Sequence, residues 1–392
     1  MNKYSAWPVF EEDEITAVLN VFKSGKVNQW TGTEVVSFEK EFAQYLGVRH
    51  AIALANGSVA LDVTLSVLGI GPGDEIIVTP RSFVASASCI VLRGATPVFV
   101  DVDPDSQNIT ARAVQNAISS NTKAVIAVHL AGWPCEMEAL KSLCGRQGLY
   151  LIEDCAQAHG AKIGGKPAGS FGDFAAFSFC QDKIMTTGGE GGMLVTDNEE
   201  LWRRAWSLKD HGKDYDAVFH DEHAPGFRWM VKSFGTNYRM TEMQAAIGRV
   251  QLKKLDAWVA KRRRLASVLT EGFKEFEALR VTCTPDHVYH SYYKYYVFVK
   301  PERLNKGWSR DRILMTLAEK GVPCGTGACP ELYLEEAFDT CEWRTSEGGK
   351  KRLEVARQLG ETSMMLLVHP TLEEADMHFI VGEMADVMKY AA

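Results

Sequence analysis

Long apolar runs are absent from this sequence: no stretch approaches the ~18 residues that a membrane-spanning helix requires. The first residues, MNKYSAWPVFEEDE, contain no basic segment followed by an apolar core, so we expect no secretory signal peptide. Cysteines are few, nine in 392 residues, and the closest pair, Cys324 and Cys329, has no second pair at metal-ligand spacing. These absences disfavour a membrane protein, a disulfide framework and a zinc site, and they favour reduced thiols and a cytoplasmic location.

A strong excess of one charge is also missing. The chain has 43 Lys and Arg against 50 Asp and Glu, a net charge of −7, which creates no overall attraction to nucleic acid. The longest basic cluster, residues 261–264, lies on a predicted helix and is most simply a solvated face. The histidines have no metal-ligand spacing, and no strand–GxGxxG–helix pattern is present. The sequence therefore disfavours nucleic-acid binding, a metal site and nicotinamide-dependent oxidoreduction.

What the sequence does contain is a regular alternation of apolar strands and amphipathic helices. Strands are predicted at 75–80, 96–103 and 123–130, with a helix after each, as expected for βαβ units in a mostly parallel sheet. We predict an α/β fold whose large domain has three layers, with a mostly parallel sheet between two layers of helices.

A long helix predicted over residues 241–276 marks a change of pattern, because short strands and helices of a smaller α+β unit follow it. We expect a large domain over residues 1–255 and a smaller C-terminal domain over 256–392. The stretch from 213 to 233 has no clear periodicity and is predicted to be a loop insertion.

Residues 151–197 are the stretch around which we expect the rest of the chain to be organised. One apolar strand ends in Glu153 and Asp154, and a second, at 174–179, is followed by Lys183 and a glycine-rich turn. An acid at the carboxyl end of a buried strand lies where open α/β sheets bind ligands. A lysine beside Ile184 and Met185 is partly removed from water, which favours a nucleophilic amine. Pyridoxal phosphate chemistry requires this pair, a lysine for the Schiff base and a carboxylate for the pyridine nitrogen.

Taken singly, each of these residues has a simpler explanation. Most loop lysines are solvated, and many acids at strand ends cap the next helix. The glycines at 188–192 can form an ordinary hairpin turn, or they can let the backbone pass close to a planar cofactor. Residues 160–167 resemble a nucleotide P-loop, but Pro167 stands where that motif needs Ser or Thr. The combination of an acid, a lysine and a phosphate-binding turn carries the prediction.

Three further positions are candidates for contact with a cofactor. The turn before the predicted helix at Ser58 places backbone amides where they can bind a phosphate. Phe83 follows a strand and can either join the core or stack on a pyridine ring. Ser178 can bond to backbone or donate to a phosphate.

The segment EDCAQAHGA…GSFGDFAAFSF…K…TTGGEGGMLVT resembles the signature of the DegT/DnrJ/StrS sugar aminotransferases, which are fold-type I pyridoxal phosphate enzymes. Further matches follow in order along nearly the whole chain: SGKVNQWTG, FEKEFAQYLGV, GPGDEIIVTP, GATPVFVDVD, KAVIAVHLAG, GTNYRMTEMQAAIGRVQL and LLVHPTL. One branch of the family has His at the lysine position and dehydrates its substrate, so Lys183 favours transamination.

The resemblance implies a role for each candidate. Lys183 would bind the cofactor as a Schiff base and carry the proton, and Asp154 would pair with the pyridine nitrogen. Gln157 would face the cofactor's 3-hydroxyl, and Phe83 would stack on its ring. The phosphate would be held by Gly57, Ser58 and Ser178, with Asn237 supplied by the neighbouring subunit of a homodimer.

The resemblance further implies transfer of an amino group, with L-glutamate as the expected donor, to a keto sugar that is usually nucleotide-linked. The product would serve amino-sugar, surface polysaccharide or lipopolysaccharide biosynthesis. A free keto sugar acid such as an 8-oxo-3,8-dideoxy-octulosonate is an alternative acceptor, and a dehydratase or a non-catalytic regulator is less favoured. Arg81, Arg228 and Lys232 are candidates to bind an anionic substrate, although solvated surface charge explains them equally well. Segments 290–298 and 324–338 resemble only part of the family and lie where the sugar is expected.

Overall fold

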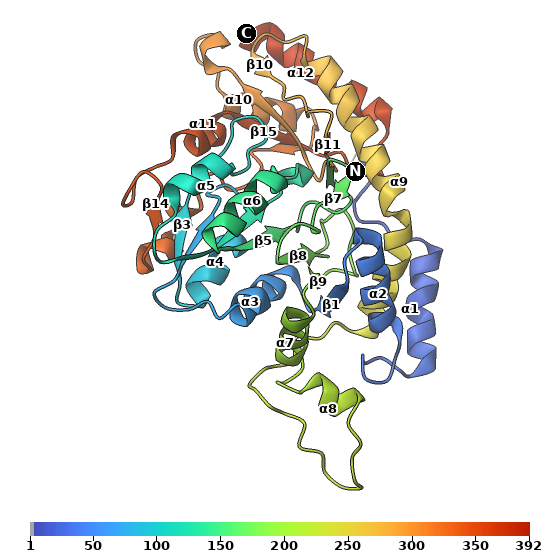
Figure 1. Ribbon diagram of the computed structural model, residues 1–392. Helices are drawn as coiled ribbons and strands as arrows, with labels where there is room; N and C mark the ends of the chain where they lie inside the picture. Colours follow the sequence, from blue (N-terminus) through green and yellow to red (C-terminus); the bar gives the residue numbers. More distant parts are fainter. Residues whose placement is uncertain (1–3) are drawn as a thin grey trace.

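The structure is a computed structural model that describes residues 4–392. Helices cover both faces of a large central sheet, and a smaller sheet with its own helices lies beyond one end of it (Figure 1). The helices are α1 (Glu12–Ser24), α2 (Glu34–Leu46), α3 (Gly57–Val67), α4 (Ala85–Leu92), α5 (Ala111–Ala117), α6 (Met137–Gln147), α7 (Glu199–Lys209), α8 (Tyr215–Phe219), α9 (Glu242–Phe273), α10 (Arg310–Glu319), α11 (Glu354–Thr362) and α12 (Glu374–Ala391).

The large sheet is mixed but mostly parallel, with the strand order β1-β9-β8-β5-β4-β2-β3-β14. β9 runs antiparallel to both β1 and β8, and the remaining neighbours are parallel. Its strands are β1 (His50–Leu54), β2 (Glu75–Val78), β3 (Thr96–Phe99), β4 (Thr122–Val128), β5 (Tyr150–Asp154), β8 (Phe174–Ser178), β9 (Gly192–Thr196) and β14 (Arg344–Thr345).

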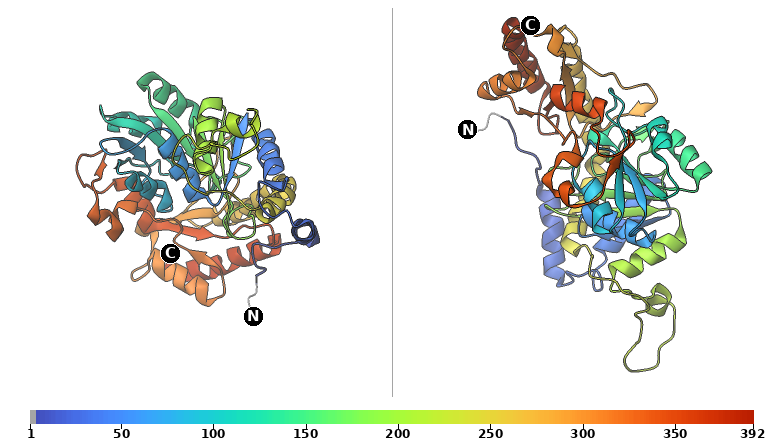
Figure 2. Two further views of the ribbon diagram at one scale, coloured as in Figure 1. Left: turned by 90° about the horizontal axis from the view of Figure 1, so that it is seen from below. Right: turned by 90° about the vertical axis from the view of Figure 1, so that its left-hand side faces the viewer.

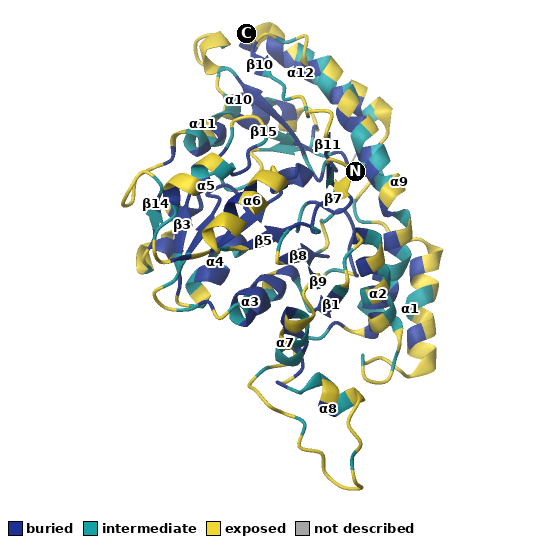
Figure 3. Cartoon of the chain, viewed as in Figure 1, coloured by how far each residue is buried: buried dark blue, intermediate teal, exposed yellow. Residues whose placement is uncertain are grey.

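The three predicted layers follow from alternation along these strands. Ile76 and Val78 of β2 point into a core shared with α3, α4 and α7, whereas Ile77 points into a core shared with α5 and α6. Strands buried on both faces need apolar residues at every position, which explains the continuous apolar runs in the sequence. Figure 3 shows these strands as the most buried part of the chain.

The C-terminal region forms a second, antiparallel sheet with the order β10-β12-β15-β13, and a small sheet has the order β11-β6-β7. A separate apolar core joins the first of these sheets to α9, α10 and α12. The strands are β6 (Lys162–Ile163), β7 (Lys166–Pro167), β10 (Leu279–Arg280), β11 (Val288–Tyr289), β12 (Tyr295–Val299), β13 (Cys324–Gly325) and β15 (Ser363–Leu366). Short 3₁₀ turns occur at Leu130–Gly132, Pro301–Arg303, Leu332–Leu334 and Glu336–Thr340.

α9, predicted over residues 241–276, runs along the side of the molecule from the large sheet to the C-terminal core. The C-terminal region also returns to the large sheet, because β14 pairs with β3 at its edge. The division into domains at residue 255 therefore stays a prediction.

Residues 210–237, which we call the arm, lie between α7 and α9. They project away from the body in Figure 1 and in the right-hand view of Figure 2. Sequence reasoning predicted a loop over most of this stretch, and the structure adds the short helix α8. Within the described residues, no helix combines the length and apolarity needed to cross a bilayer.

Candidate active site

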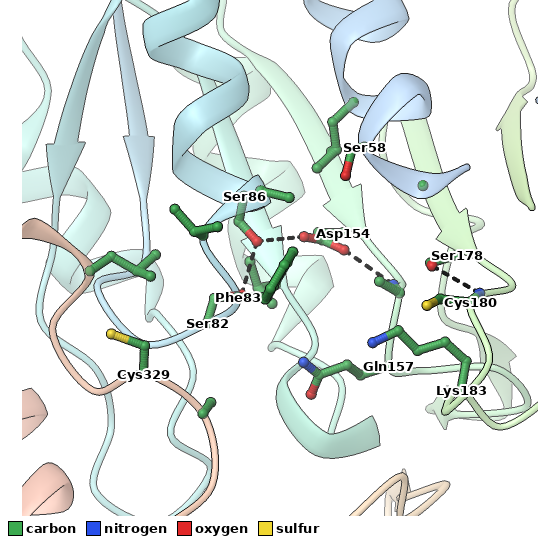
Figure 4. Close-up of a pocket in the computed structure, with 18 of the residues that line it drawn as sticks. Ser58, Ser82, Phe83, Ser86, Asp154, Gln157, Ser178, Cys180, Lys183 and Cys329 are labelled. Carbon is green, nitrogen blue, oxygen red and sulfur yellow. Dashed lines mark hydrogen bonds between the residues drawn. The ribbon is translucent and has the colours of Figure 1, made fainter. Parts of the chain in front are cut away.

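A cavity of about 1120 Å³ opens where the ends of β5 and β8 and the starts of α3 and α4 face the C-terminal region. Such a volume is large for a small-molecule site. The predicted cofactor residues that line it are Gly57, Ser58, Phe83, Asp154, Gln157, Ser178 and Lys183. Figure 4 shows that the side chains of Asp154 and Lys183 enter the same space.

Asp154 is the last residue of β5 and is 6% exposed. Its Oδ2 accepts a 2.6 Å hydrogen bond from the Ser86 hydroxyl, and its Oδ1 accepts one of 3.1 Å from the Ala156 amide. The Ser86 oxygen lies 2.9 Å from that of Ser82, which precedes α4 (Figure 4). Within residues 4–392, no basic side chain forms an ion pair with Asp154. The carboxylate is therefore held firmly in place without a cation.

The neighbouring acid, Glu153, points to the opposite face, as alternation along a strand requires. It is fully buried and accepts hydrogen bonds from the backbone amides of Gly169, Phe171 and Gly172. Burial raises the pKa of Glu153, but the hydrogen bond and charge of His129, together with these amides, hold it below its usual value. Glu153 therefore anchors a loop, and only Asp154 faces the cavity.

Lys183 lies in the loop after β8, and its side chain is 15% exposed. The residues that follow it, Ile184 and Met185, are completely buried, as the sequence suggested. The Lys183 Nζ lies 3.5 Å from the Tyr293 hydroxyl and 3.7 Å from Asp182 Oδ1. The Tyr293 hydroxyl in turn donates to Asp182. The amine thus lies inside the cavity, next to a coupled tyrosine and aspartate.

The start of α3 forms a cradle beside Ser178. Asn56 caps the helix by accepting a 2.9 Å hydrogen bond from the Val59 amide. A Cβ on Gly57 would lie only 2.7 Å from the Ser178 Cβ, so glycine is needed for this close approach. The free amides at the start of the helix and the Ser178 hydroxyl therefore face the same end of the cavity.

Gln157 is oriented by the backbone. Its Oε1 accepts a 2.8 Å hydrogen bond from the Ala131 amide, and a backbone amide can only donate. The side-chain NH₂ of Gln157 is therefore left as a donor toward the cavity. Phe83 also lines the cavity and is 64% exposed as a residue. This is an unusual position for a large apolar residue unless a flat ligand covers it.

Arg81 does not line the cavity, in contrast to the prediction that it could contact the substrate. Its side chain is completely buried, with Nε donating to Gln107 at 2.8 Å and one terminal nitrogen donating to Ser363 at 3.0 Å. The guanidinium also lies 5.6 Å from the Tyr296 ring, which lines the cavity. Arg81 and Ser82 point to opposite sides of an extended chain, so Arg81 supports the cavity wall from behind.

The other three predicted residues belong to the arm. Arg228 and Asn237 are exposed, and Lys232 forms a 3.1 Å ion pair with Asp214. None of the three lines the cavity of its own chain.

Sequence reasoning missed several residues that complete the cavity: Ser86, Asp182, Tyr293, Lys294, Tyr296 and Cys329. Three of these, Tyr293, Lys294 and Tyr296, lie in segment 290–298, and Cys329 lies in segment 324–338; both segments were expected near the substrate. Asp182 is adjacent to Lys183, and Ser86 lies in the first turn of the helix that follows Phe83, so both carried a weak local signal.

These observations test whether pyridoxal phosphate fits the residues present. A buried carboxylate without a cation suits a protonated pyridine nitrogen, and a helix start crowded against Ser178 suits a phosphate. An accessible lysine amine and an exposed aromatic ring lie in the same cavity. The donor set therefore fits the cofactor.

Comparison with known proteins identifies the family. Residues 8–385 match the model of the DegT/DnrJ/EryC1/StrS aminotransferase family. The chain belongs to this family. GDP-perosamine synthase from Caulobacter vibrioides is 36% identical over 365 residues, 91% of each protein.

Two solved structures extend the comparison. The aminotransferase from Psychrobacter cryohalolentis is 50% identical, with a TM-score of 0.95 and coverage of 98% of this chain and 99% of that one. DesV from S. venezuelae, determined in complex with a ketimine intermediate, is 31% identical, with a TM-score of 0.84 and coverage of 96% and 94%. The protein is therefore a pyridoxal-phosphate-dependent sugar aminotransferase with the fold-type I architecture.

Proposed function

We propose that this aminotransferase moves the amino group of L-glutamate to the carbonyl carbon of a nucleotide-linked keto sugar. The observation that carries the proposal is that Lys183 and Asp154 face one cavity whose other end is a helix start suited to phosphate. The cavity volume of about 1120 Å³ leaves room for a sugar nucleotide beside the cofactor. The resemblance to GDP-perosamine synthase supports a nucleotide-linked acceptor.

In this proposal Lys183 attaches the cofactor through Nζ, and the bound cofactor supplies an electron sink for the charge that develops on the donor's Cα. The free Lys183 amine would then take the proton from the donor's Cα and return it on the cofactor side. The position of Nζ inside the cavity, among buried neighbours, supports this role because a proton-transfer group must reach the reacting carbon.

Asp154 holds a proton on the pyridine nitrogen. The hydrogen bonds from Ser86 and Ala156 fix the plane of its carboxylate, so the acid needs no reorganisation during the reaction. At the opposite end, the amides at Gly57 and Ser58 and the hydroxyl of Ser178 hold the phosphate.

Two further contacts orient the ring between these ends. The Gln157 NH₂ would donate to the cofactor's 3-hydroxyl oxygen, and the Phe83 ring would stack on the pyridine.

We further propose that the enzyme is a homodimer with shared active sites. The arm has large exposed apolar side chains, with Phe227 at 80%, Trp229 at 87% and Phe234 at 101% exposure. A surface of this kind on a projecting segment is typical of an interface. Docking of the arm onto a second copy would bring Asn237 to the partner's phosphate site, with Arg228 and Lys232 near the partner's substrate.

The wider role proposed is synthesis of an amino sugar for a surface polysaccharide or lipopolysaccharide, in the cytoplasm. All nine cysteines lie in the described part of the chain and are free thiols, which is in keeping with a reducing compartment.

The test is to purify the protein, record the visible absorption of its bound cofactor, and add L-glutamate followed by a panel of nucleotide-linked keto sugars. Loss of the cofactor band with glutamate and its return with one keto sugar is the expected result. A protein that neither binds pyridoxal phosphate nor responds to any amino donor would contradict the proposal.

A further inference from the structure

The lining of the cavity has more acidic than basic side chains. Among its lining residues, all of them in the described part of the chain, only Lys183 and Lys294 have basic side chains. The acids are more numerous: Asp154, Asp182, Glu190, Glu335 and Glu336. Because Lys183 is committed to the cofactor, Lys294 is the cation that this chain's own lining leaves to meet a substrate.

Lys294 is half-buried, and its Nζ lies 4.8 Å from the centre of the Tyr293 ring, whose other neighbour is the Lys183 Nζ at 4.9 Å. Across the described residues 4–392, the ammonium of Lys294 has no hydrogen bond and no ion pair. Asp182, an acid that also lines the cavity, is already engaged by the Tyr293 hydroxyl and by Lys183. A largely desolvated ammonium without a partner binds an anion strongly.

We propose that Lys294 is the anchor for a substrate carboxylate, carried either by the amino donor or by a sugar acid acceptor. This inference rests on the proposed aminotransferase function and adds a specificity-determining residue to it. A single carboxylate matches a single ammonium. The two phosphates of a nucleotide-linked acceptor need more than one cation, and in the proposed dimer Arg228 and Lys232 of the partner subunit would meet them.

The experiment uses the cofactor-loaded protein as wild type, Lys294→Met and Lys294→Arg. Methionine keeps the length and removes the charge, whereas arginine keeps the charge. The cofactor absorption band of each variant first checks folding and loading. The donor arm follows this band during reaction with L-glutamate. The acceptor arm compares 8-oxo-3,8-dideoxy-octulosonate, which has a carboxylate on the sugar, with a GDP-linked 4-keto sugar, which has none.

We expect Lys294→Met to raise the half-saturating concentration of one carboxylate-bearing partner by about tenfold or more, and by more than the limiting rate falls. Lys294→Arg should recover most of this loss. If the half-saturating concentration of glutamate rises, Lys294 binds the carboxylate of the donor. If only that of the octulosonate rises, Lys294 binds the carboxylate of the acceptor.

Half-saturating concentrations within about twofold of wild type for both partners would overturn the role of Lys294. Failure of the wild type to react with any amino donor would instead contradict the proposed function, so the two failures are distinguishable.

Discussion

At the scale of single residues, the account depends on what each side chain can reach. Asp154 and Glu153 are neighbours with opposite surroundings, one facing the cavity and the other anchoring a loop. Lys183 and Lys294 flank one tyrosine ring and are proposed to have different tasks, one on the cofactor and one on the substrate.

The first prediction at this scale concerns Asp154. Asp154→Asn keeps the shape of the side chain but cannot hold a proton on the pyridine nitrogen as a carboxylate does. We expect the rate of the glutamate half-reaction to fall by about 10²–10⁴-fold with the cofactor still bound. Rapid mixing with absorbance detection measures this rate. A near-wild-type rate in a loaded protein would remove Asp154 from the proposed role.

A second prediction concerns pH. The pKa of Lys294 is lowered to about 8, chiefly by burial and in part by the Arg262 and Lys183 charges, while the Asp182 charge opposes the shift. His369 and the Tyr293 ring also face Lys294. Only the protonated amine attracts a carboxylate, so affinity for the carboxylate-bearing partner should be full below this pKa and fall as pH rises through about 8.

Lys294→Arg is the control for this pH dependence, because a guanidinium stays protonated throughout the range. The half-saturating concentration is measured from about pH 6.5 to about pH 9.5, a range that brackets the titration of the lysine. It should rise with pH for the wild type and change less for the arginine variant. Identical profiles for the two proteins would contradict the assignment of the titrating group to Lys294.

At the scale of elements, the site depends on the close approach of α3 to β8. Gly57→Ala would place a methyl group 2.7 Å from the Ser178 Cβ, and neither backbone can yield easily. We expect weaker binding of pyridoxal phosphate and a loss of about 1–3 kcal/mol in the free energy of unfolding. Cofactor titration by absorbance and chemical denaturation check the two effects separately.

Gly145→Ala is the matched control, because a Cβ on this glycine of α6 would have nothing within 4 Å. Alanine is the better helix former, so this variant should gain about 0.5–1 kcal/mol and bind the cofactor normally. Equal behaviour of the two variants would show that the approach of α3 to Ser178 is not needed for cofactor binding.

Local sequence signals predicted several elements well: the strands expected at 75–80, 96–103 and 123–130 are β2, β3 and β4, and the helix expected over 241–276 is α9. Glycine stops are equally clear in the structure. α1 and α2 end at Gly25 and Gly47, both with φ of 69°, the left-handed conformation that glycine adopts freely. Arg81 was a candidate to contact the substrate but lies buried behind the cavity wall. The direction of its side chain depends on alternation at the end of a strand, which the sequence alone did not determine. The segment that contains Tyr293 and Lys294 was expected near the substrate, but neither residue was singled out, since only the packing of the C-terminal region brings them to Lys183.

At the scale of the whole molecule, the arm is the feature that a single chain leaves unexplained. Phe227 and Trp229 contact each other, with ring centres 4.7 Å apart, and are otherwise strongly exposed. We expect the double variant Phe227→Ser, Trp229→Ser to weaken dimerisation and to lower activity together with it, because the proposed active site includes the partner's arm.

Sedimentation velocity over a range of protein concentrations measures this effect. Leu92→Ser is the control, because Leu92 is 75% exposed on α4, away from the arm. A wild-type protein that remains monomeric at every concentration and is still active would contradict the shared active site.

The central claim is that the amine of Lys183 carries the cofactor in the cavity closed by Asp154. Reduction of the loaded protein with borohydride, followed by peptide mass mapping, fixes the cofactor to the lysine that holds it. The account predicts the added pyridoxyl mass on the peptide that contains Lys183 and on no other. The same mass on the peptide that contains Lys294, with Lys183 unmodified, would contradict it.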